Sequence, residues 1–166
     1  MVYLLGVLIL ASLVVLQTAV FSHVILLNGT ADLVMLAVVA WSLQKKARNT
    51  WIWAIIGGLL VGYVSAIPFW ASLVGYLLAA GVAILLKRRV WQVPFLAMIV
   101  ATLCGSLIMN WIVVAALRIA EVPVSLFESL NQIILPGILL NLLLALPFYF
   151  LFTDLAGLLY PADLEM

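Results

Sequence analysis

The sequence contains very few charged residues. Only 8% of its 166 residues are Asp, Glu, Lys or Arg, against 69% hydrophobic residues. A soluble domain carries about 25% charged residues, so too few polar side chains are present to cover a surface in water. The formal net charge of +1 also excludes the strongly basic surface of a nucleic-acid-binding module. The composition therefore excludes a soluble domain and predicts no nucleic-acid partner.

Cysteine and histidine are almost absent as well. Cys104 is the one cysteine and His23 the one histidine, which excludes an internal disulfide and leaves no second His or Cys at the spacing of a metal site. Paired carboxylates, a Ser-His-Asp arrangement and a glycine-rich phosphate loop are missing too. We therefore expect no enzymatic activity, no cofactor and no metal.

What the sequence does have is long apolar runs. A membrane-spanning helix needs about 20 apolar residues, so the length allows roughly five or six spans and little else. The runs predict an all-α fold, a polytopic membrane helical bundle of six transmembrane helices in a single domain over residues 1–166. The expected spans cover residues 2–22, 31–43, 51–67, 68–86, 93–117 and 132–153.

The start of the second span is open to two interpretations, because polar residues interrupt the run and its purely apolar part is too short to cross a membrane alone. Either the span begins near His23 with polar residues inside it, or residues 22–30 form a loop and the helix begins at Thr30 or Ala31. In the second case Thr30 is the expected N-cap, and Asp32 lies in the first turn, where a carboxylate suits the helix dipole.

Two short basic segments decide the expected topology. They hold Lys45, Lys46 and Arg48, and Lys87, Arg88 and Arg89. Two spans separate the segments, so both lie on one side, and short cytoplasmic loops carry the excess of Lys and Arg. We therefore expect both segments and both termini in the cytoplasm. Aromatic residues of the interfacial belt are expected at Trp51, Trp53, Trp91 and Tyr160.

Small residues recur at every fourth position in the third and fourth spans. The third span holds Ala54, Gly58, Gly62 and Ala66, and the fourth holds Ala71, Gly75, Ala79 and Ala83. In lipid, close packing needs small residues that let backbones approach, and a spacing of four keeps them on one helix face. Because the chain turns at Ile67–Pro68, we expect the two stripes to face each other or to bind a partner.

Polar residues within the apolar runs are the remaining candidate sites. They are Asp32, Asn110, Asn131 and Asn141. An ionisable residue at membrane depth indicates function by default, although a carboxylate at a helix start is also satisfied by its own helix end. The three amides need partners in the bilayer, typically across helices. Asn141 lies between Pro136 and Pro147, where a structural and a functional role are both open.

Several short segments occur in a particular order along the chain. They are Thr30-Ala31-Asp32-Leu33-Val34, Gly57-Gly58-Leu59-Leu60-Val61-Gly62, Pro68, Gly75-Tyr76-Leu77-Leu78 and Leu135-Pro136-Gly137-Ile138-Leu139-Leu140-Asn141-Leu142-Leu143-Leu144-Ala145-Leu146-Pro147. Together with the size, the six spans and the short loops, this order resembles the MreD family, the small integral membrane component of the bacterial rod-shape machinery. The resemblance covers nearly the whole chain. It departs at residues 63–66, where family members often carry an acidic residue.

This resemblance implies a non-enzymatic scaffold in the bacterial inner membrane. Its partner would be MreC, a bitopic protein, and through MreC the RodA glycosyltransferase and its penicillin-binding transpeptidase, which build peptidoglycan and control cell shape. The MreD family is also similar in fold to the substrate-binding S components of energy-coupling factor transporters, which gives the alternative function. An interaction protein needs small-residue grooves and no ionisable centre, whereas a solute-binding subunit needs several polar groups converging near the outer face.

Overall fold

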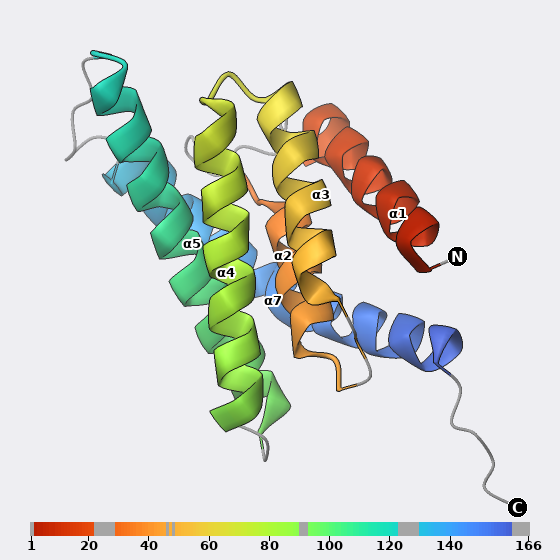
Figure 1. Cartoon of the computed structure of the whole chain (residues 1–166). Helices are drawn as coiled ribbons and strands as arrows, with labels where there is room; N and C mark the ends of the chain where they lie inside the picture. The colour runs from red at the N-terminus through yellow and green to blue at the C-terminus, as the bar shows by residue number, and fades with distance from the viewer. Residues whose placement is uncertain are drawn as a thin grey trace, which may run out of the picture.

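The structure is a computed structural model that describes residues 2–21, 29–45, 47, 49–89, 93–122 and 130–160. These residues form a bundle of six α-helices without strands (Figure 1). The helices are α1 (Val2–Leu16), α2 (Leu33–Leu43), α3 (Thr50–Val64), α4 (Phe69–Arg89), α5 (Pro94–Ile119) and α7 (Leu135–Leu159). A wider helical turn, η1 (Gln17–Phe21), extends α1, and another, η2 (Leu130–Ile134), leads into α7. The expected all-α helical bundle is confirmed.

Some residues of the sequence analysis lie outside the described residues. They are His23, Lys46, Arg48 and Trp91.

The short helix α2 lies at the centre of the bundle. Every residue from Leu33 to Leu43 is buried, and α2 contacts α1, α3, α4, α5 and α7. Figure 1 shows α2 behind α3 and α4, with α7 crossing obliquely behind it. A helix that is apolar on all sides is typically buried on all sides, so the sequence of α2 already favours a place in the core.

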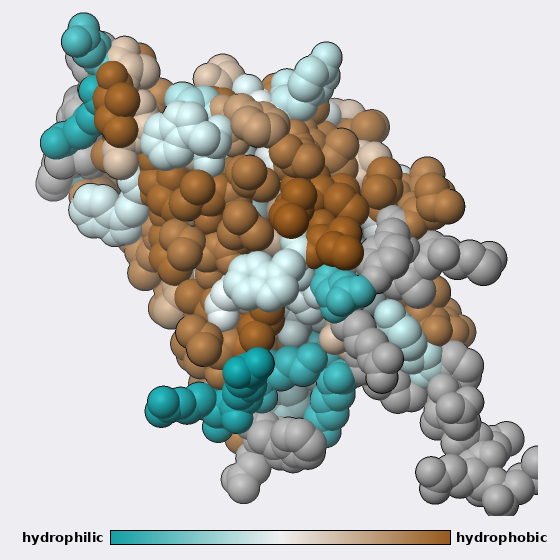
Figure 2. All heavy atoms as spheres, in the orientation of Figure 1, coloured by the Kyte–Doolittle hydropathy of each residue, from teal (hydrophilic) through white to brown (hydrophobic). Residues whose placement is uncertain are grey.

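Three helices are long and apolar enough to cross a membrane: α4, α5 and the continuous segment Leu130–Leu159. The apolar helices α1, α2 and α3 are shorter. At about 1.5 Å per residue, α2 covers about 16 Å, roughly half of a hydrocarbon core of about 30 Å. Figure 2 shows a broad hydrophobic surface between hydrophilic patches near two ends of the molecule. The length and composition of these three helices indicate a membrane protein, in which the central helix α2 would be too short to cross alone.

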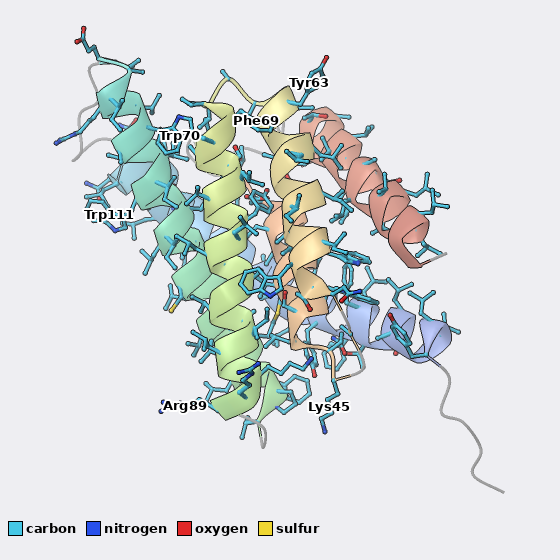
Figure 3. All side chains as sticks on the ribbon, in the orientation of Figure 1. Lys45, Tyr63, Phe69, Trp70, Arg89 and Trp111 are labelled. Carbon is cyan, nitrogen blue, oxygen red and sulfur yellow. The ribbon has the colours of Figure 1, made fainter. Side chains whose placement is uncertain are left out.

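The two ends of the bundle differ in the side chains they carry. Figure 3 shows Lys45 and Arg89 at the lower end, and Tyr63, Phe69 and Trp70 at the upper end. We call the lower end the basic end and the upper end the far end. Helix α4 runs from the far end to the basic end, and α5 returns in the opposite direction (Figure 1).

The small residues of α3 pack against α4. A Cβ atom added at Gly58 would lie 2.9 Å from Leu73 Cα, and one at Gly62 would lie 3.2 Å from a Phe69 ring carbon. Ala54, one turn before Gly58, is fully buried. Helix α3 ends at Val64, a few residues before the expected end of the span. Ala66 is therefore an exposed residue of the turn before α4 and lies outside the helical stripe.

The small residues of α4 face a different neighbour. A Cβ atom added at Gly75 would overlap the Met109 sulfur of α5, and one at Gly105 of α5 would lie 3.2 Å from Ala79 Cβ. Ala71 and Ala83 of the same stripe are fully buried. The expectation that the two stripes face each other is therefore wrong, since larger α4 residues meet α3 and the α4 stripe meets α5. The physical reason is that α4 is packed on two sides, and its small residues serve the second neighbour.

Aromatic rings fill the core near the basic end. The rings of Trp41 in α2 and Trp53 in α3 stack with their centroids 4.4 Å apart. Phe152 of α7 meets both edge-on, at centroid distances of 6.4 and 6.1 Å. Trp53 is only 1% exposed, so its expected place in the interfacial belt is wrong. It lies one turn before Gly57, which faces Val34 and Val38 of α2, and this shared face turns Trp53 inward.

Candidate functional site

The candidate site begins at Asp32, which caps the buried start of α2. Its Oδ1 accepts a hydrogen bond of 2.9 Å from the Met35 backbone N–H, the bond that a carboxylate N-cap makes. The helix therefore begins at Leu33 with Asp32 as its N-cap, and the expectation that Thr30 is the N-cap is wrong. A carboxylate accepts two donors more readily than a hydroxyl, which favours Asp32 for this position.

Side chains from two other segments cap the remaining N–H groups of this turn. Gln17 Oε1, in η1, accepts from the backbone nitrogens of Leu33 and Val34 at 3.0 and 3.4 Å. Asn141 Oδ1, in α7, accepts from the Asp32 backbone nitrogen at 2.8 Å. A helix start leaves four N–H groups without intrahelical partners. In α2 all four are satisfied by side chains of this chain.

The capping residues are joined to α4 and α5 as well. The Tyr76 hydroxyl of α4 donates to Asp32 Oδ1 at 2.7 Å, and Asn141 Nδ2 donates to Ser106 Oγ of α5 at 3.0 Å. Asn141 and Ser106 are 5% and 1% exposed. We call Gln17, Asp32, Tyr76, Ser106 and Asn141 the polar network. It links η1, α2, α4, α5 and α7 through hydrogen bonds in the interior of the bundle.

The polar network lies well inside the bundle. Tyr76 is seven residues beyond the start of α4 at Phe69, which corresponds to a depth of about 10 Å at about 1.5 Å per residue. A backbone polar group in hydrocarbon needs an internal partner, because no water reaches it. The network supplies such partners to the backbone N–H groups at the start of α2.

The other two candidate amides do not join the polar network. Asn110 Nδ2 donates to the Ser106 carbonyl of its own helix at 2.8 Å. Asn131 lies in η2 and is exposed. The expected pairing of amides across helices therefore holds for Asn141, while Asn110 is satisfied within α5.

Sequence reasoning missed three members of the polar network: Gln17, Tyr76 and Ser106. Tyr76 stands beside Gly75 in an otherwise apolar and small-residue stretch, and Gln17 stands near the end of the first apolar run. Their polar character was the available signal. Nothing in their spacing connects them to Asp32, because they belong to three different helical segments.

Two buried hydroxyls lie one helical turn from the polar network and are not part of it. Ser72 Oγ and Thr102 Oγ1 have no hydrogen-bond partner among the described residues. They precede Tyr76 and Ser106 by four residues, so each shares a helix face with a network member. The network thus ends at Tyr76 and Ser106.

The chemistry of the polar network is that of a structural clamp. Its single carboxylate receives one backbone N–H and one phenolic O–H, and its two amides receive backbone N–H groups. In the described parts of the chain no three His, Cys, Asp or Glu side chains lie together.

A second feature lies on the surface between α5 and η2. A small hollow of about 70 Å³ is lined by Leu107, Asn110, Trp111, Val114, Leu130 and Ile134. Trp111 is 66% exposed and points away from the bundle in Figure 3. No described residue donates a hydrogen bond to Asn110 Oδ1. We call these six residues the α5 groove.

Comparison with known proteins gives no relative: no protein-family model, no curated protein and no solved structure matches the chain.

Proposed function

We propose that the chain is a non-enzymatic membrane scaffold of the bacterial cell elongation complex, as its resemblance to the MreD family implies. It would dock a bitopic MreC-like protein and, through it, the RodA glycosyltransferase and the penicillin-binding transpeptidase. All six helices would lie in the inner membrane with both termini in the cytoplasm.

The observation that carries this proposal is that the segments of the resemblance meet in space. Asp32 comes from residues 30–34, Tyr76 from residues 75–78 and Asn141 from residues 135–147, and hydrogen bonds join them. These segments lie far apart in the sequence. Composition alone gives no reason for their few polar residues to meet and form hydrogen bonds. Their convergence supports the proposal, because it joins the segments that carry the resemblance into one structural unit.

The α5 groove supports docking of a single membrane-spanning helix. Asn110 presents an amide oxygen without a described partner, beside the exposed ring of Trp111. Polar side chains hydrogen-bond across helices in lipid, at about 0.5–2 kcal/mol each, and exposed aromatic residues are frequent anchors of interfaces. A bitopic partner with a Ser, Thr or Asn in its span fits this surface.

The alternative function, a solute-binding S component, depends on polar groups that are free to hold a ligand. Of the polar groups near the outer face, Asp32 is hydrogen-bonded to the α2 backbone and to Tyr76, and His23 lies outside the described residues. This geometry favours the scaffold. Mass spectrometry of the purified protein would detect a co-purifying vitamin-sized solute if the alternative holds.

The scaffold proposal is tested by expression in a rod-shaped bacterium that lacks its own MreD, together with the MreC-like protein of the source organism. We expect the wild-type chain to restore rod shape and to recover that protein from solubilised membranes. The double variant N110L/W111A should reduce recovery by about tenfold or more, the change expected for a central interface anchor.

The matched control is Leu143→Ala, which removes an apolar side chain of α7 that is 72% exposed and lies outside the α5 groove. Recovery of the partner should be unchanged in this variant. Equal recovery with N110L/W111A and wild type would place the partner elsewhere. Failure of the wild-type chain both to restore shape and to recover the partner would contradict the scaffold function itself.

A further inference from the structure

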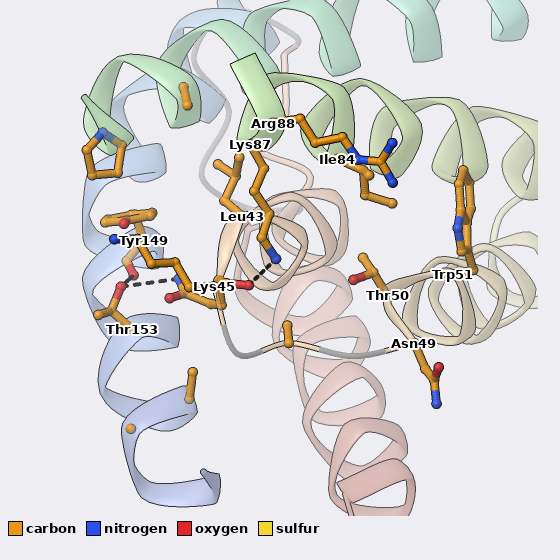
Figure 4. Close-up of a pocket in the computed structure, with 16 residues that line it drawn as sticks. Leu43, Lys45, Asn49, Thr50, Trp51, Ile84, Lys87, Arg88, Tyr149 and Thr153 are labelled. Carbon is orange, nitrogen blue, oxygen red and sulfur yellow. Dashed lines mark hydrogen bonds between the residues drawn. The ribbon is translucent and has the colours of Figure 1, made fainter. Parts of the chain in front are cut away.

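A hollow of about 1040 Å³ opens at the basic end of the bundle. Figure 4 shows that it lies between the end of α2, the start of α3, the end of α4 and the second half of α7. The start of α5 also contributes, through Pro94 and Ala97. We call it the basic pocket. Pockets that bind small-molecule ligands measure about 300–1,000 Å³, so the basic pocket is at the upper end of that range.

The charge of the basic pocket has one sign. Lys45, Lys87 and Arg88 line it, and none of its lining residues is Asp or Glu. Arg88 is exposed, and no described residue accepts a hydrogen bond from its guanidinium. A cationic pocket without a carboxylate selects an anion.

Lys87 is held in place at the edge of this pocket. Its ammonium donates to the Gln44 backbone carbonyl, and Gln44 Nε2 donates to Thr153 Oγ1 of α7 at 3.2 Å. Figure 4 shows this chain of hydrogen bonds running from α4 to α7. An ammonium has three N–H donors, so Lys87 keeps two for a ligand while its position is fixed.

The remaining wall of the basic pocket is apolar. Leu43, Ile84, Ala97 and Ala156 line it, and Trp51 stands at its rim with 49% of its surface exposed. A soluble anion gains nothing from such a wall, whereas an acyl chain does. Basic pockets between membrane helices at the headgroup level bind anionic lipids for this reason.

We propose that the basic pocket binds one anionic glycerophospholipid, with its phosphate at Arg88 and Lys87 and an acyl chain along the apolar wall. The position of the pocket supports this occupant, because it lies where the apolar surface of the bundle meets the basic end. The proposal does not depend on a role in cell elongation.

The test uses the full chain purified in a mild non-ionic detergent and measures lipid binding by native mass spectrometry. The probes are dioleoyl-phosphatidylglycerol and dioleoyl-phosphatidylcholine, which share acyl chains and differ in headgroup charge. We expect tighter binding of phosphatidylglycerol by the wild-type chain. Arg88→Gln should weaken that binding about fivefold, the change that corresponds to about 1 kcal/mol of lost attraction per basic residue, and should leave phosphatidylcholine binding unchanged.

Arg89→Gln is the matched control, because it removes the same charge from the same helical turn but does not line the pocket. Its effect on phosphatidylglycerol binding should stay below about twofold, since exposed charges outside a site are screened. Equal losses in the two variants, or no preference of the wild-type chain for phosphatidylglycerol, would overturn the proposal. Displacement of the lipid by an equal concentration of glycerol phosphate would also overturn it, because a free phosphate would then suffice.

Discussion

The two ends of the bundle interior are closed in different ways. Toward the far end, the polar network joins helical segments through hydrogen bonds between named atoms, with distances of 2.7–3.4 Å. Toward the basic end, the stacked rings of Trp41 and Trp53 fill the core, and the basic pocket opens beside them. Hydrogen bonds are directional, whereas ring packing depends mainly on area and volume.

This difference separates the part of the bundle that determines the fold from the part that is open to a ligand. In the polar network each residue is hydrogen-bonded to another part of the bundle, so a change in one residue leaves another buried polar atom unpaired. At the basic end, apolar contacts stabilise the core, and the charged groups lie around it at the surface. We therefore expect the half near the network to determine the fold and the basic end to accept a ligand.

The largest effect should come from removing the carboxylate at the centre of the network. Asp32→Ala leaves the Met35 N–H and the Tyr76 O–H without their acceptor, at about 1–3 kcal/mol for each buried donor. We expect a loss of about 3 kcal/mol in the free energy of unfolding, measured by titration with a denaturing detergent. Asp154→Ala, at an exposed carboxylate of α7, should change stability by less than about 0.5 kcal/mol. Equal stability of both variants would mean that the network does not hold the bundle.

A smaller effect is expected from two glycine substitutions, one at the close contact between α3 and α4 and one beside the basic pocket. Gly58→Ala brings a Cβ to 2.9 Å from the Leu73 backbone, and overpacking of this kind costs about 1–3 kcal/mol. Gly157→Ala, in α7 beside the basic pocket, meets nothing within 4 Å and should stabilise the helix by about 0.5–1 kcal/mol. Thermal unfolding followed by circular dichroism measures both changes. A change of the same sign in the two variants would contradict the close contact at Gly58 and the open space at Gly157.

The smallest effect compares two hydroxyls on one face of α5. Ser106→Ala takes the acceptor from Asn141 Nδ2 and should destabilise the chain by about 1 kcal/mol. Thr102→Val replaces a buried hydroxyl without a described partner and should be neutral or stabilise the chain by up to about 1 kcal/mol. The same unfolding assay applies. A loss of stability with Thr102→Val would show that this hydroxyl belongs to the network.

Much of the fold could be predicted from the sequence, because apolar runs and their polar interruptions determine helices in lipid. The runs predicted six helices, as the structure has, although α7 continues to Leu159, six residues beyond the predicted end of the last span. Asp32 and Asn141 were identified as candidates. The partners of these two residues could not be predicted. Gln17, Tyr76 and Ser106 reach the start of α2 only once the helices are packed, and helix packing has no local signal.

The stripes of small residues show the same limit. Their spacing correctly indicates which face of a helix is packed, since Gly58, Gly75 and Ala79 all lie at helix contacts. It does not indicate the neighbour, because any helix with a complementary surface can fill the place. The order of α3 and α4 along the chain suggested each other as partners, but α5 takes the second stripe. The orientation of Trp53 was missed for the same reason.

The cap of α2 also has a consequence for how the chain is made. The amide that accepts the Asp32 backbone N–H belongs to Asn141, 109 residues later in the chain. At about 5–20 residues per second on the ribosome, roughly 5–20 seconds pass between the synthesis of these two residues. During that interval α2 has a short apolar segment and an incomplete polar start. The cap of α2 is therefore completed only after α7 has been synthesised.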